Sequence, residues 1–229
     1  MTISQEKKEA VMDSATAIII FITEVIGTVA FSVSGTIVAI DHGLDVFGVI
    51  FIGCITAVGG GIMRDIMLGA VPPVAFVNPY PMLIAAIASL VVFVVAYTLR
   101  GRYTALRARI DVINNIFDAI GLAAFAVMGT ENAIAAGYGE NVLFCVSLGT
   151  VTCIGGGMLR DVMTNSTPYV LKKRIYALAS IAGCLFYLLL SRMDLHPSVP
   201  TLSAMILVFA IRMLATVFRW SLPKIAPAL

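Results

Sequence analysis

Two copies of one glycine-rich, charged motif contain the residues of this chain most able to do chemistry. Gly-Gly-Gly-Ile-Met-Arg-Asp occupies positions 59–65, and Gly-Gly-Gly-Met-Leu-Arg-Asp occupies positions 155–161. Each copy lies inside a long apolar run, where a charged side chain is costly and indicates a path for an ion or a solute. Three adjacent glycines weaken a helix because they have high backbone entropy and no side chain to pack. We therefore expect each triplet to form a kink or an unwound turn that exposes carbonyl oxygens to the solute.

The candidate pore residues are both triplets, the charged pair after each, and one carboxylate in the first helix of each half. They are Gly59, Gly60, Gly61, Arg64, Asp65 and Glu24 in the first half, and Gly155, Gly156, Gly157, Arg160, Asp161 and Asp118 in the second. Adjacent residues on a helix point about 100° apart, so the arginine and aspartate of one motif need not bridge each other. We expect contacts across the two halves, with Arg64 or Arg160 within salt-bridge reach of one of the four carboxylates Asp65, Asp161, Glu24 and Asp118. Two structural interpretations stay open. The glycines could serve only close helix packing, and the charged pairs could serve only as clamps between helices.

The remaining polar residues give no indication of an enzyme. The sequence has no Cys and His cluster with metal-ligand spacing, no nucleophile beside a base, and no Gly-x-x-x-x-Gly-Lys phosphate loop. We therefore expect no catalytic residue, no bound metal and no cofactor. Asn114 is expected at the membrane interface. Arg212 is expected to reach toward the cytoplasmic surface or to join a contact between subunits.

Membrane helices must position these residues, because the chain is too apolar for a soluble protein. It is 60% hydrophobic and 12% charged, with a mean hydropathy of +1.00, whereas soluble domains carry about 25% charged residues. Seven runs approach the length of about 20 apolar residues that crosses a bilayer, and the sixth is the marginal one. They are Ala15–Ile40, Val46–Gly69, Pro81–Leu99, Val112–Ala136, Val142–Met163, Arg174–Leu190 and Val199–Phe218. The sequence thus predicts an all-α polytopic membrane protein with seven transmembrane helices.

The two motif copies belong to longer repeats. Thr56 matches Thr152 at a spacing of 96 residues, and upstream Glu24 matches Asp118 at a spacing of 94. Because each unit has an odd number of helices, the second must enter the membrane from the opposite side, which makes the repeats inverted. The two Arg-Asp pairs should then lie at mirrored depths. The predicted divisions are a hydrophilic tail (1–14), repeat 1 (15–100), a basic linker (101–111), repeat 2 (112–192), and a seventh helix with a C-terminal tail (193–229).

Basic residues collect on the side opposite the N-terminus. They occur in Arg100–Arg109, in Lys172–Arg174 and after the last run. The positive-inside rule therefore places the N-terminus outside and the C-terminus in the cytoplasm. The same clusters are candidate contacts for anionic lipids, and they give no indication of nucleic-acid binding.

The doubled Gly-Gly-Gly-x-x-Arg-Asp motif in a three-plus-three-plus-one layout resembles the prokaryotic trimeric intracellular cation (TRIC) channel family. This bacterial group is also described as glycine transporters. The resemblance covers about Ala17 to Phe218. It implies a homotrimer in the bacterial inner membrane, with a pore in each subunit between the repeats and helices two and five kinked at the triplets. It also implies permeation by monovalent cations, chiefly potassium and also sodium. Animal members carry a Lys-Glu-Val motif for phosphoinositide binding; this sequence lacks it, so that regulation is not carried over.

Three functions stay open at this point. A channel needs a continuous water-filled passage lined by polar groups. A secondary carrier for a small zwitterion such as glycine needs a central site, for which an arginine and a carboxylate beside broken helices would be suitable anchors. A membrane scaffold without transport activity is disfavoured by the paired charges inside the apolar runs.

Overall fold

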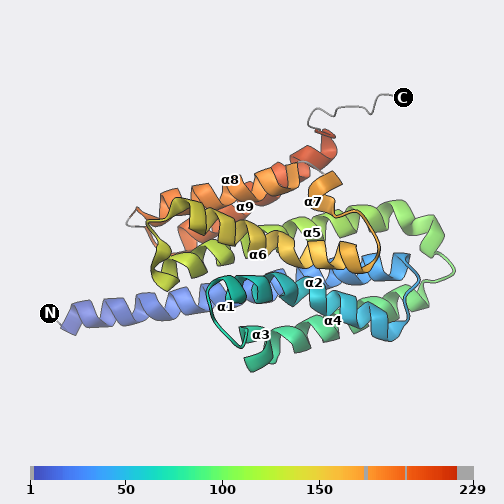
Figure 1. Cartoon of the computed structure of the whole chain (residues 1–229), viewed down its shortest axis with the longest axis horizontal. Coiled ribbons are helices and arrows are strands. Elements are labelled where there is room, and N and C mark those ends of the chain that lie inside the picture. Colours follow the sequence, from blue (N-terminus) through green and yellow to red (C-terminus); the bar gives the residue numbers. More distant parts are fainter. Residues whose placement is uncertain (1–2, 173–174, 194, 221–229) are drawn as a thin grey trace.

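The computed structural model describes residues 3–172, 175–193 and 195–220, and every regular element in these ranges is a helix (Figure 1). The long helices are α1 (Ile3–Asp41), α2 (Val46–Met67), α4 (Tyr80–Thr98), α5 (Tyr103–Ala133), α6 (Val142–Met163), α8 (Ile175–Ser191) and α9 (Ser198–Val217). Short elements lie between them: α3 (Val74–Val77), the π-helical turn η1 (Ile134–Tyr138) and α7 (Tyr169–Lys172).

The predicted class, an all-helical membrane protein, is confirmed. Six helices of the described chain are long and apolar enough to cross a membrane, and α8 is a seventh apolar helix of 17 residues. At 1.5 Å per residue, α8 is about 26 Å long, slightly less than the hydrocarbon core of about 30 Å. This short helix corresponds to the sixth run, which was the marginal one in the sequence.

Two segments expected outside the spans continue the neighbouring helices. The predicted hydrophilic tail is helical from Ile3 onward, because α1 begins there. The predicted basic linker (101–111) forms the first turns of α5, which begins at Tyr103. The divisions themselves stay a prediction. Lys173 and Arg174 belong to the second basic cluster, and Arg174 begins the sixth predicted run; both lie outside the described residues.

The helices of the two halves make corresponding contacts. Helix α1 packs against α2 and α4, and α5 packs in the same way against α6 and α8. The halves meet where α1 contacts α5 and α2 contacts α6, while α9 covers α5 and α8. In Figure 1, α2 runs from right to left and α6 from left to right, and α1 and α5 are likewise antiparallel.

The two glycine triplets lie where α2 crosses α6. A Cβ atom at Gly60 would overlap the Thr152 carbonyl oxygen, and one at Gly156 would overlap the Thr56 carbonyl oxygen. A Cβ at Gly59 would lie 3.4 Å from the Gly156 Cα. The triplets therefore allow a close approach of two helix backbones, as small residues do at membrane helix crossings.

The expectation of an unwound turn at each triplet is wrong. Helices α2 and α6 are described along their whole lengths, and both stay α-helical through residues 59–61 and 155–157. Their carbonyl groups therefore keep their helical hydrogen bonds instead of facing a solute. Neighbouring helices supply enough packing to offset the low helix propensity of glycine. A bend of the helix axis at these positions stays a prediction.

A second crossing joins α1 and α5 through an aromatic pair. The Phe31 and Phe125 rings stack with their centroids 5.3 Å apart. Each ring also occupies the space beside a glycine of the other helix: Phe31 lies against Gly121, and Phe125 lies 3.0 Å from a Cβ built at Gly27. Phe31 and Phe125 match in the sequence at the spacing of 94 residues. The contacts are thus reciprocal, as they are across a two-fold axis.

Candidate functional site

Arg160, near the end of α6, is the centre of a buried ionic network. Its Nε donates to Asp161 Oδ1 at 2.8 Å, and its Nη1 donates to Ser34 Oγ at 2.9 Å and to Asp118 Oδ1 at 3.4 Å. The Tyr176 hydroxyl donates to the same Asp118 oxygen at 3.4 Å. Helices α1, α5, α6 and α8 therefore meet in one network, in which α8 joins through Asp118.

Helix α9 adds a second arginine to this network. Arg212 Nη2 lies 3.6 Å from Asp118 Oδ2, and its guanidinium carbon lies 4.6 Å from the centre of the Tyr176 ring. The side chains of Arg160 and Arg212 are only 1% and 3% exposed. Two arginines thus balance Asp118 and Asp161, which offsets the desolvation that buried ions suffer.

The first half contains a smaller and more open cluster. Arg64 donates to Asp65 Oδ1 from Nε at 2.8 Å and from Nη2 at 2.7 Å. The Arg64 side chain is 12% exposed, and half-buried Glu24 lines the same cavity as this pair. Among the described residues, no second arginine joins this cluster as Arg212 joins the other. Two carboxylates therefore face one guanidinium, which leaves this end with an excess of negative charge.

The aspartates of the two motifs also hold the short helices that follow. Asp65 Oδ2 accepts from the backbone N–H of Val74 at 2.8 Å, and Asp161 Oδ2 accepts from that of Tyr169 at 2.7 Å. The position of the first half that matches Tyr169 is Pro73, which has no N–H to donate, so the bond moves to the next residue. Each aspartate thus joins its arginine to the start of α3 or α7.

The two clusters differ in the space around them. The cavity lined by Glu24, Arg64 and Asp65 has a volume of about 30 Å³, which is room for a water molecule. The space between Arg160, Asp161 and the two nearby tyrosines has no room for one. Because α2 and α6 end at opposite ends of the bundle (Figure 1), one end has room for a water molecule and the other is closed by packed side chains.

The expected pairing is found only in part. The prediction that an arginine of the motifs lies within reach of Asp118 is confirmed by Arg160. The expectation that ion pairs join the two halves is wrong, because the ion pairs of Arg64 and Arg160 connect residues of the same half. Each arginine also bridges to its own neighbour, since a long flexible side chain spans the 100° between adjacent positions. Of the polar contacts of Arg160, the one that joins the halves is its hydrogen bond to Ser34.

Sequence reasoning missed three members of the network. Ser34 resembles any small residue of a membrane helix. Tyr176 had a detectable signal, because it matches Tyr80 at the spacing of 96 residues. Asn114 was expected only at the membrane interface, without a partner inside the protein: it is 8% exposed, and its Oδ1 accepts from Ser34 Oγ at 2.7 Å. Arg212, expected at the cytoplasmic surface or in a subunit contact, instead points into the protein.

The fold and the site together define a polytopic helical membrane protein with buried ion clusters toward both ends of the bundle. A family model described as glycine transporter matches residues 21–98 and again residues 115–192. A UPF0126 membrane protein of Vibrio cholerae is 33% identical over 219 residues, which is 94% of this chain and 87% of the relative. The UPF0126 inner membrane protein YadS of Escherichia coli is 32% identical over 166 residues, covering 72% of this chain and 75% of the relative. The chain therefore belongs to the UPF0126 membrane protein family, whose family model is described as glycine transporter.

Solved structures give the same result. A prokaryotic TRIC channel solved in 0.5 M KCl is 32% identical and superposes with a TM-score of 0.79, covering 90% of this chain and 100% of that one. The trimeric intracellular cation channel orthologue of Rhodobacter sphaeroides is 27% identical with a TM-score of 0.78, covering 88% and 99%. The resemblance to TRIC channels is therefore confirmed.

Proposed function

We propose that this protein is a cation channel that conducts chiefly potassium, and also sodium, through a path inside each subunit. The similarity to structures described as TRIC cation channels supports the channel class. The ionic clusters toward the two ends of one bundle support a path that passes between the two halves.

The path rests on an architecture of seven spans with two inverted repeats and a final helix. Three observations support it: the family model matches the chain twice, the halves make reciprocal contacts at their glycines and phenylalanines, and corresponding helices run in opposite directions (Figure 1). The pseudo-two-fold axis then passes between Gly60 and Gly156. Inverted repeats place the solute site at their interface.

The cavity at Glu24 is the proposed entrance for cations. Its carboxylate, with Asp65, outnumbers the single Arg64, so the local potential favours a cation over an anion. The partial exposure of this cluster lets an arriving ion keep part of its water. This excess of carboxylates at an open cavity is the observation that carries the proposal.

The network around Asp118 is the proposed gate. In the arrangement described above, Arg160, Arg212 and Tyr176 fill the position where a cation would meet the Asp118 carboxylate. A cation passes this end only when the two arginines move away from Asp118. The contact of Arg212 is the looser one at 3.6 Å, and helix α9 is therefore the element proposed to move.

A carrier for glycine is the second candidate, because the matching family model is described as a glycine transporter. At the open cluster, Arg64 would bind the carboxylate of a zwitterion and Glu24 its ammonium group. A carrier of this kind moves labelled glycine but carries no steady potassium current. A scaffold without transport activity would show neither.

Purified protein reconstituted into lipid separates these functions. The proposal predicts single-channel potassium currents in planar bilayers and no uptake of labelled glycine into liposomes made from the same preparation. Saturable glycine uptake without channel currents would establish the carrier instead. Absence of both activities would favour the scaffold.

The proposed assembly is a homotrimer in the bacterial inner membrane, with the N-terminus outside and the C-terminus in the cytoplasm. The neighbouring trimeric channel orthologue supports the trimer, and the inner membrane protein YadS supports the location. The basic segment Arg100–Arg109 lies at the same end of the bundle as the end of α9 (Figure 1). The positive-inside rule makes that end cytoplasmic.

A further inference from the structure

A cavity lies between the end of α5, the end of α8 and the beginning of α9, and we call it the α5–α8–α9 cavity. It has a volume of about 180 Å³, which is room for several water molecules or for one small organic molecule. Its apolar walls include Ile19 of α1, and Met193 and Leu195 from the loop before α9. Among the described residues that line it, the charged one is Glu131 of α5.

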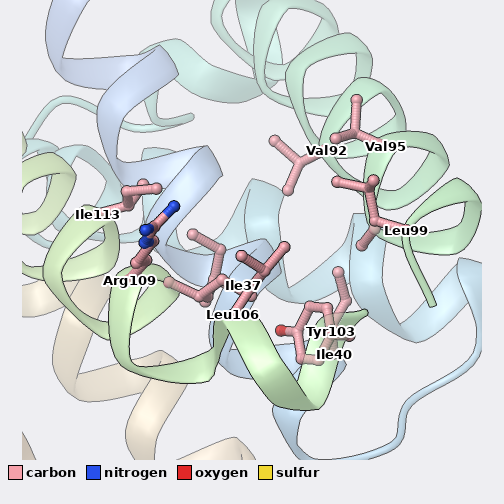
Figure 2. Close-up of a pocket in the computed structure, with 11 residues that line it drawn as sticks. Ile37, Ile40, Val92, Val95, Leu99, Tyr103, Leu106, Arg109 and Ile113 are labelled. Atoms are coloured by element: carbon pink, nitrogen blue, oxygen red, sulfur yellow. The ribbon is translucent and has the colours of Figure 1, made fainter. Parts of the chain in front are cut away.

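The carboxylate in this cavity is not a requirement of the repeated fold. The residue of the first half that matches Glu131, at the spacing of 94 residues, is Ile37. Ile37 lines a groove between the end of α1, the end of α4 and the beginning of α5 (Figure 2), and there Ile113 matches Ile19. An apolar side chain therefore suits this place in the fold, and packing alone does not account for Glu131.

Glu131 is a half-buried carboxylate without a counter-charge. In the part of the chain that the structure describes, it has no hydrogen bond and no ion pair. Arg192, at the end of α8, lies 3.7 Å from the Glu140 carboxylate instead. A carboxylate withdrawn from water is unfavourable unless a cation or a hydrogen-bond donor satisfies it. The partner that the cavity lacks is therefore a positively charged one.

The hydroxyl groups of the cavity offer acceptors to such a cation. Ser191 Oγ donates its proton to the Leu188 carbonyl oxygen at 3.0 Å, and Thr201 Oγ1 donates to the Pro197 carbonyl oxygen at 3.1 Å. A hydroxyl group has one proton and two lone pairs, so both oxygens keep lone pairs that can accept. Three N–H groups on one cation, as in a primary ammonium, match a carboxylate and two hydroxyl oxygens.

The beginning of α9 gives an anion no hydrogen bond in this cavity. The N–H of Ser198 donates to His196 Nδ1 at 3.4 Å, and that of Val199 donates to the His196 carbonyl oxygen at 2.9 Å. Pro200, the third residue of α9, has no N–H. The described lining also contains no arginine or lysine. A zwitterion such as glycine, or a lipid headgroup with a phosphate, would therefore leave its negative group unsatisfied.

We propose that the α5–α8–α9 cavity binds a small organic cation, a primary ammonium group on a short aliphatic chain. Glu131 balances the charge of the ammonium group, and the oxygens of Ser191 and Thr201 accept its remaining hydrogen bonds. The aliphatic chain lies against the apolar walls, such as Ile19 and Met193. This site is separate from the Glu24 cavity, and the proposal does not depend on whether the protein conducts ions.

Fluorine NMR of a trifluoromethyl-labelled butylammonium tests the proposal, with the purified full-length protein in detergent at constant ionic strength. The broadening of the probe signal reports binding, and unlabelled competitors with the same four-carbon chain report which head group is recognised. n-Butylammonium should displace the probe. Butyltrimethylammonium, which has no N–H group, should do so about tenfold more weakly. Butyrate and glycine should not displace it.

Substitutions locate the bound probe. Glu131→Gln keeps the shape and removes an unpaired charge, so it should fold and should bind the probe about tenfold more weakly. Glu131→Asp, which keeps the charge, should retain most of the affinity, and Thr201→Val should lose part of it. The matched controls are Glu140→Gln, a fully exposed glutamate, and Thr216→Val, whose hydroxyl likewise donates to the carbonyl four residues before it. Both controls should bind as the wild type does.

Three results would overturn the proposal. Wild-type affinity in monodisperse Glu131→Gln protein would show that the carboxylate does not bind the ammonium group. Loss of binding in Glu24→Gln but not in Glu131→Gln would place the amine in the cavity of the first half. Displacement of the probe by potassium chloride as effective as that by n-butylammonium would show a site for inorganic cations instead.

Discussion

At the scale of single residues, the two motifs have the same sequence pattern and different surroundings. Arg160 contacts Asp161, Asp118 and Ser34 in a nearly fully buried position, whereas Arg64 contacts Asp65 beside an open cavity. The pattern Arg-Asp predicts the local ion pair and the bond to the following short helix. The difference between the halves depends on Arg212 and Tyr176, which reach the second cluster from two other helices, α9 and α8.

Replacing the two motif arginines should therefore have unequal effects on stability. Arg160→Met leaves Asp118 and Asp161 short of one buried positive charge, which should lower the free energy of unfolding by about 3–5 kcal/mol. Arg64→Met should cost less, because Arg64 is 12% exposed, beside a cavity with room for a water molecule, and neutralises Asp65 alone. Unfolding of the purified protein in detergent measures both. Arg192→Met, whose arginine is 53% exposed, should change stability by about 0–1 kcal/mol. Equal losses in the two motif variants would contradict the difference in burial.

At the scale of the helices, the sequence predicted most elements and misjudged the triplets. Apolar runs give the long helices because each run must satisfy its own backbone hydrogen bonds in lipid. Glycine runs are ambiguous, since the same residues either weaken a helix or let another backbone approach it. Here the glycines let another backbone approach, because Gly60 lies against the Thr152 carbonyl oxygen and Gly156 against that of Thr56. The sequence does not reveal this, because it does not show which helix packs against α2. The short helices α3 and α7 were missed because four residues leave little periodic pattern.

Alanine substitutions within one triplet test the packing interpretation. Gly60→Ala would place a methyl group against the Thr152 carbonyl oxygen, and a backbone atom in a packed crossing cannot rotate away. We expect a large loss of folded protein, measured as the monodisperse yield after purification. Gly61→Ala is the matched control, because the nearest atom to its Cβ is Arg64 Nη2 at 3.7 Å. Gly61→Ala should fold normally. A normal yield for Gly60→Ala would show that α2 and α6 do not cross as closely as described.

At the scale of the whole molecule, α9 makes two similar halves unequal. It covers α5 and α8 and brings Arg212 to Asp118, while the first half keeps an open cavity at Glu24 and an open groove beside α1 and α4. The sequence predicted an unpaired seventh helix, but not that this helix would seal one cluster. The asymmetry gives the proposed path an open entrance and a closed gate.

The proposed orientation is tested by fusions at the C-terminus. The end of α9 lies with the basic segment Arg100–Arg109, so the positive-inside rule places it in the cytoplasm. A C-terminal green fluorescent protein should be fluorescent, and a C-terminal alkaline phosphatase should be inactive. Active phosphatase and a dark fluorescent protein would show that the open Glu24 cavity faces the cytoplasm instead.

The potassium conductance of Glu24 variants tests the central claim most directly. If the carboxylate at the open cavity draws cations into the path, Glu24→Gln should lower single-channel potassium conductance and weaken the preference for potassium over chloride. Glu24→Asp, which keeps the charge, should retain both. The reversal potential in a KCl gradient measures the preference on the same channels. Unchanged conductance and reversal potential in correctly folded Glu24→Gln protein would contradict a cation path through this cavity.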